Sequence, residues 1–126
     1  MSTVLRVVSV LYAAILVFAT AAHVSHILEY GWFPYSELTG AHWSLNLYWT
    51  ALTVVNPLLA GFVLWRPRPG AYLFALHMVI NACTNAFALR TYENLLVAEA
   101  GVVRQAVIAA VAVLFSLWLL VSSRSE

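Results

Sequence analysis

The chain contains no lysine and no aspartate, and its only charged side chains are six arginines and five glutamates among 126 residues. Charged residues make up 9% of the chain and hydrophobic residues 63%, which is too little charge to cover the surface of a water-soluble domain. The composition therefore indicates an integral membrane protein whose main partner is the lipid bilayer. Because the arginines are few and evenly spread, no nucleic-acid partner is expected.

Cysteine is also scarce. Cys83 is the single cysteine, so the chain has no intramolecular disulfide and no Cys-x-x-Cys motif for zinc or redox chemistry. Any chemistry must come from the other polar side chains.

Four long apolar runs cover residues 4–28, 43–65, 71–89 and 102–121. Each is long enough to cross a hydrocarbon core, which takes roughly 20 helical residues. They predict an all-α fold, a four-helix integral membrane bundle forming a single domain over residues 1–126. A signal peptide is the alternative for residues 1–22, because Arg6, an apolar run and "ATAA" imitate its three regions. We expect a retained first helix.

The charged residues predict the orientation of these helices. One side of the membrane should carry Arg6, Arg66, Arg68 and Arg124, and the other should carry Glu29, Glu37, Glu93 and Glu99 with Arg90 and Arg104. By the positive-inside rule, both termini are expected in the cytoplasm.

Polar residues recur inside two of the predicted spans. His77, Asn81 and Asn85 follow one another at steps of four and share one narrow helical face, which cannot point at lipid. In the second span Pro57 displaces the carbonyl of Thr53, so a kink with a free acceptor is expected. The predicted ligand-binding residues are His77, Asn81, Asn85, Asn56, Asn46 and Thr53. Alternatively, these groups only join helices through hydrogen bonds worth about 0.6 to 2 kcal/mol each.

His77 is the candidate catalytic residue. An ionisable group near the bilayer centre is costly and marks a functional site unless a partner satisfies it. The alternative is a neutral imidazole bonded to Asn56 or to the freed carbonyl of Thr53.

The stretch "HVSHILEY" predicts a metal site of a different kind. His23, His26 and Glu29 spread over roughly a third of the helix circumference, and His42 begins the next span at the same level. This ligand set suits zinc or copper, with Glu93 or Glu99 as a further ligand. The alternative is an interfacial helix end whose side chains meet water.

Haem fits these histidines less well. His23 and His77 should differ in depth by roughly 15 Å, whereas two axial imidazoles must face one iron. A His26 and His42 pair remains geometrically possible.

Two stretches, "NLYWTALTVVNPLLAGFVLWRPRPG" and "HMVINACTNAFAL", resemble a group of small, uncharacterised bacterial four-helix membrane proteins. That group shows an Asn-Leu-Tyr-Trp start, an acid-Pro step and an Arg-Pro-Arg loop, and Asn56 stands here at the acidic position. The resemblance implies a bacterial inner membrane.

The layout is more distantly similar to the EXPERA family of sterol isomerases and sigma-2-type receptors. The shared features are four spans, a histidine near the end of the first, a proline in the second and a histidine in the third. This similarity implies a hydrophobic ligand held in a bundle cavity, and isomerisation. The chain lacks the acid that such isomerases carry in the second span.

These observations favour a protein that binds a small, largely apolar ligand in a His/Asn-lined pocket. It could act as an accessory subunit of a larger membrane complex or as a homo-oligomer, since the alanine-rich "AVIAAVAV" stretch permits close helix approach. The alternatives are an isomerase-like membrane enzyme using acid and base chemistry on a lipid-soluble substrate, and a metal-binding protein.

Overall fold

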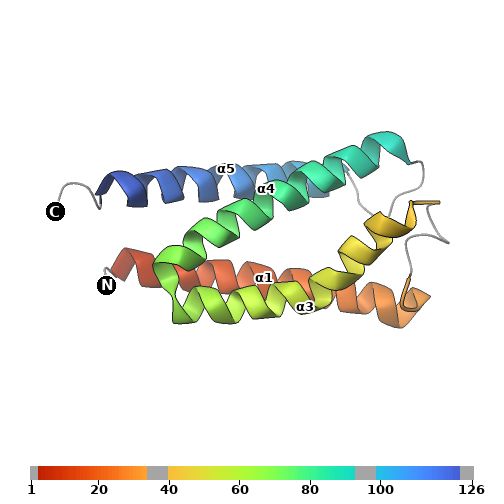
Figure 1. The fold of residues 1–126 in the computed structure, drawn as a ribbon, viewed down its shortest axis with the longest axis horizontal. Coiled ribbons are helices and arrows are strands. Elements are labelled where there is room, and N and C mark those ends of the chain that lie inside the picture. Colours follow the sequence, from red (N-terminus) through yellow and green to blue (C-terminus); the bar gives the residue numbers. More distant parts are fainter. Residues whose placement is uncertain (1–2, 34–39, 93–98, 123–126) are drawn as a thin grey trace.

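The computed structural model describes residues 3–33, 40–92 and 99–122, which form four helices (Figure 1). They are α1 (Thr3–Tyr30), α3 (Trp43–Trp65), α4 (Pro67–Thr91) and α5 (Glu99–Ser122). Each predicted span lies within one of these helices, and all four are long and apolar enough to cross a membrane. The predicted all-helical membrane bundle is confirmed.

The helix boundaries follow from local chemistry. The turn between α3 and α4 is a single residue, Arg66, with φ −126° and ψ 73°. Pro67 disfavours a helical conformation at Arg66, and prolines in the first turn of α4 are tolerated because that turn needs no donor. At the other end of α3, Nδ1 of His42 accepts a hydrogen bond from the backbone N–H of Ser44 at 3.4 Å. The helix continues through Pro57, and Figure 1 shows it changing direction in its first half.

The four helices are paired. Helix α1 packs along α3, and α4 packs along α5, while α3 and α4 join the two pairs. Within the described ranges, the backbones of α1 and α5 do not approach each other. We call the end that carries Thr3, the Arg66 turn and Ser122 the termini end, and the opposite end, where α1 and α4 finish, the loop end (Figure 1).

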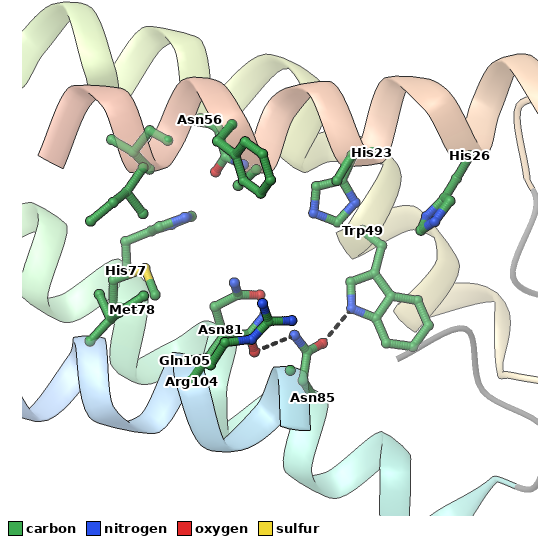
Figure 2. A pocket seen from close by; sticks show the side chains of 17 residues that line it. His23, His26, Trp49, Asn56, His77, Met78, Asn81, Asn85, Arg104 and Gln105 are labelled. Carbon is green, nitrogen blue, oxygen red and sulfur yellow. Dashed lines mark hydrogen bonds between the residues drawn. The ribbon is translucent and has the colours of Figure 1, made fainter. Parts of the chain in front are cut away.

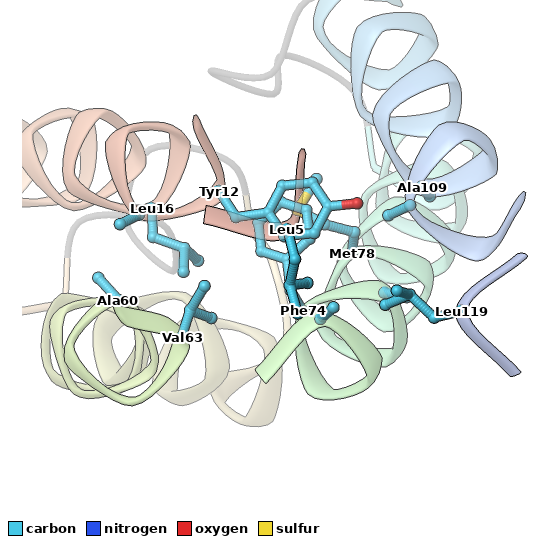
Figure 3. Packing of buried hydrophobic residues seen from close by; sticks show 13 residues of the cluster. Leu5, Tyr12, Leu16, Ala60, Val63, Phe74, Met78, Ala109 and Leu119 are labelled. Atoms are coloured by element: carbon cyan, nitrogen blue, oxygen red, sulfur yellow. The ribbon is translucent and has the colours of Figure 1, made fainter. Parts of the chain in front are cut away.

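The main cluster of buried apolar residues occupies the half nearer the termini end (Figure 3). Leu16, Val63 and Phe74 are almost completely buried there. The ring of Tyr12 stacks on Phe74 with centroids 3.8 Å apart and meets Phe115 edge-on at 6.3 Å. This edge contact joins α1 to α5 near the termini end, where their backbones remain apart.

Polar and apolar residues are distributed as a hydrocarbon solvent requires. Many large apolar side chains face outward, among them Phe18, Leu28 and Trp65. The buried polar residues are Ser9, Asn46, Asn56, Asn81, Asn85 and Ser116. Since polar groups are costly in lipid, this arrangement places the exposed apolar surface against the hydrocarbon.

Candidate functional site

A cavity of about 400 Å³ lies among the four helices in the half nearer the loop end (Figure 2). Its α1 wall consists of Ile15, Leu16, Phe18, Ala19, Ala22, His23 and His26. The remaining lining residues are Trp49, Asn56, His77, Met78, Asn81, Asn85, Gly101, Arg104, Gln105 and Ile108. A mostly apolar wall thus faces a more polar one.

Helix α4 supplies the polar edge of the cavity. His77, Asn81 and Asn85 all line it, because steps of four residues place side chains one above another on a helix. Asn56 adds a fourth polar group from α3. The other two predicted ligand-binding residues, which are Asn46 and Thr53, lie outside the lining.

Asn46 and Thr53 have other surroundings. Asn46 is 1% exposed and buried within the bundle. The hydroxyl of Thr53 donates to the carbonyl of Thr50 at 2.7 Å, a bond within α3 itself. Thr53 therefore contributes to its own helix rather than to the cavity.

A hydrogen-bond relay closes the loop end of the cavity. Nε1 of Trp49 donates to Oδ1 of Asn85 at 2.7 Å, and Nδ2 of Asn85 donates to Oε1 of Gln105, also at 2.7 Å (Figure 2). One turn away, the hydroxyl of Tyr48 donates to Oδ1 of Asn81 at 3.3 Å. The relay ties α3, α4 and α5 together at one point.

Trp49, Arg104 and Gln105 are lining residues that the sequence analysis missed. Two signals in the sequence pointed to Trp49 and Gln105. An indole N–H in an apolar run needs a buried partner, and Gln105 is an isolated amide near the start of the fourth span.

Asn56 is not satisfied in the same way. Its side chain is 1% exposed, and Oδ1 has no hydrogen-bond partner among the residues that the structure describes. Leaving a buried acceptor unpaired costs about 1–3 kcal/mol. Asn56 lines the cavity, but Oδ1 itself is fully buried, so a bound molecule reaches it only after the Asn56 amide turns toward the cavity. A donor on that molecule would then remove the cost.

His77 faces the same cavity and is half-buried. Figure 2 shows no hydrogen bond between His77 and Asn56. The hydrogen bond to Asn56 that would have explained His77 as a packing residue is absent. Its imidazole is available to a ligand as one donor and one acceptor.

The predicted metal site does not form among the described residues, where no three His, Cys, Asp or Glu side chains could hold an ion. His23 and His26 line the cavity, but Glu29 is exposed and His42 lies outside the lining. The ring of His42 is occupied locally, with Nδ1 2.9 Å from Oγ of Ser44. The structure therefore corrects the proposed convergence of these four side chains.

The same placement bears on haem and on the further metal ligands. His26 lines the cavity whereas His42 does not, so the cavity does not bring this pair together. The predicted extra ligand Glu93 lies outside the described residues, and Glu99 is exposed at the start of α5.

The chain matches no protein-family model, no curated protein and no solved structure. The resemblances seen in the sequence therefore remain predictions, and function is argued from the cavity itself.

The mouth of the cavity lies between α1 and α5. Three of its lining residues are exposed, Phe18 and Ala22 on α1 and Arg104 on α5. The lining residues on α3 and α4 are all buried or half-buried, and Trp49 on α3 bonds to Asn85 on α4. The edge contact between Tyr12 and Phe115 closes the gap on the termini side. In a bilayer this mouth faces lipid.

Proposed function

We propose that this protein binds a small, largely apolar ligand in the His/Asn-lined cavity. The observation that carries the proposal is Asn56, a cavity-lining residue whose buried Oδ1 has no partner in the described part of the chain. The volume of about 400 Å³ is within the range of roughly 300–1,000 Å³ common for small-molecule sites. Mostly apolar walls with a few polar groups are also typical of such sites.

The proposed location is a bacterial inner membrane, with both termini in the cytoplasm. In support, Arg6, Arg66 and Arg68 all lie at the termini end, while the loop end combines its arginines with glutamates. The cavity would then lie in the non-cytoplasmic half. A fluorescent protein fused to the C-terminus should be bright, and alkaline phosphatase fused there should be inactive. The reverse result would invert the orientation.

The ligand is tested by native mass spectrometry of the protein purified in mild detergent. We expect an organic adduct on the natural chain that is lost in His77→Ala, because His77 faces the cavity. Ser25→Ala is the control, since Ser25 is exposed on α1 and outside the lining.

Other results of this experiment would point elsewhere. If the adduct has the mass of a metal ion and is lost in His23→Ala, the bound species is a metal and not an organic ligand. If there is no adduct and a second membrane protein co-purifies, the protein is an accessory subunit and not a ligand-binding protein.

A second candidate function is acid and base catalysis on a lipid-soluble substrate. The placement of His77 in the cavity, with no hydrogen bond to another lining residue, favours it. In this case a His77→Gln variant should fold and retain the adduct but leave it chemically unchanged. Identical adduct chemistry in the variant and the natural chain would contradict catalysis.

A further inference from the structure

We infer that the ligand is a hydroxyl-bearing molecule dissolved in the bilayer, which passes between α1 and α5 and donates its hydroxyl hydrogen to Oδ1 of Asn56. This inference rests on the proposed function and specifies the chemistry of the ligand and its route.

The first step is the need for a donor. Oδ1 of Asn56 can only accept hydrogen bonds; it is buried, and it has no partner in the described part of the chain. Asn56 lines the cavity, so turning its amide toward the cavity brings Oδ1 to the ligand. A ligand that fills the cavity with apolar atoms alone would leave this acceptor unsatisfied. A ligand that presents a donor there removes the penalty and gains a hydrogen bond.

The second step is that the donor should be neutral. Among the described residues, the lining includes no aspartate or glutamate, so a cationic amine would be buried there without a counter-charge. A hydroxyl is the smallest neutral donor, and it also accepts a hydrogen bond. His77 can supply that second bond or bind another polar group of the same molecule. The site therefore fits an alcohol or phenol.

The third step is the route. All exposed lining residues belong to α1 and α5, the two helices whose backbones remain apart in the described ranges. The α1 side of this mouth is apolar, with Phe18 79% exposed. A molecule dissolved in the hydrocarbon reaches such an opening without crossing water. Inside it meets the apolar α1 wall, including the small side chains of Ala19 and Ala22.

The hydroxyl is tested with two probes, a long-chain alkylphenol and its methyl ether, in which a methyl group replaces the hydroxyl hydrogen. Binding is measured by native mass spectrometry and by thermal unfolding in mild detergent. We expect the phenol to bind about tenfold more tightly than the ether, because the phenol gains one hydrogen bond and about tenfold in affinity is the usual contribution of one such bond. Asn56→Leu should abolish the difference, and Asn56→Ala serves as the second variant if the leucine disturbs the fold.

Tyr12→Phe is the matched control. The hydroxyl of Tyr12 is the other buried side-chain atom without a partner in the described part of the chain, but Tyr12 does not line the cavity. Removing it deletes an unpaired polar group of the same kind elsewhere in the bundle. The preference for the phenol should therefore survive.

The route is tested with the same phenol in liposomes. Ala22→Trp places a large side chain at the mouth and should slow association at least several-fold. Ala21→Trp adds the same group at an exposed neighbour outside the lining and should leave the rate unchanged. Equal rates in the two variants would overturn the route.

The remaining outcomes separate this inference from the proposed function. Equal binding of phenol and ether would overturn the hydroxyl and leave the cavity as a ligand site. If neither probe binds, the inference as a whole is overturned. This result is expected if a water molecule already donates to Oδ1 of Asn56. The proposed function itself fails only if the purified protein carries no organic adduct.

Discussion

Replacing Gly70 by alanine is expected to destabilise the bundle by about 1–3 kcal/mol, the usual cost of overpacking a well-packed core. A Cβ at residue 70 would lie 2.6 Å from Cα of Val63 and 3.3 Å from both Cβ and Cγ2 of that residue. Val63 is completely buried, so it cannot turn aside. The backbones of α3 and α4 would have to separate where the Arg66 turn holds them closest.

Gly61→Ala is the matched control for this prediction. A Cβ at Gly61 meets nothing within 4 Å, and the residue is exposed on the same helix as Val63. The alanine there should leave stability unchanged or raise it by up to about 1 kcal/mol through helix propensity. Both variants are compared by reversible unfolding in mixed detergent and SDS micelles. Equal stability of the two would show that α3 and α4 do not approach so closely.

Replacing Asn85 by leucine is expected to have the second large effect, a loss of about 1–3 kcal/mol. Leucine has the same branching at Cγ as asparagine, but it can neither accept from Nε1 of Trp49 nor donate to Oε1 of Gln105. Both partners would remain buried or half-buried without their hydrogen bonds. The loop end of the cavity should loosen, because one side chain joins three helices there.

Asn81→Leu provides a graded control for Asn85→Leu. Oδ1 of Asn81 accepts a hydrogen bond from the hydroxyl of Tyr48 at 3.3 Å, longer than the bonds of Asn85, so the same substitution should cost less. Unfolding in mixed micelles gives the stabilities, and the indole N–H resonance of Trp49 reports on its hydrogen bond. An unshifted resonance in Asn85→Leu would mean that the bond is not formed in solution. In a double-mutant cycle, Trp49→Phe and Asn85→Leu should be non-additive.

The candidate site was predictable where it depends on helical periodicity. Residues at steps of four share a face, so His77, Asn81 and Asn85 had to lie together, and a polar face had to turn inward. The metal prediction was wrong for the described residues because it needed side chains from two different helix ends to converge. His42 instead bonds to Ser44 in its own first turn, a local alternative that sequence spacing alone does not exclude.

The sequence by itself determined that this is a membrane protein of four helices. Its apolar composition suits a lipid environment, and each of its four apolar runs is long enough to form one membrane-spanning helix. It also determined which face of α4 is polar. Only the tertiary structure decided that Asn85 is paired with Trp49 and Gln105 while Oδ1 of Asn56 is left without a partner. It alone decided that the cavity opens between α1 and α5. Side-chain hydrogen bonds between helices, and the position of the cavity mouth, depend on how helices distant in sequence rotate and tilt against one another. Local sequence patterns do not predict those angles.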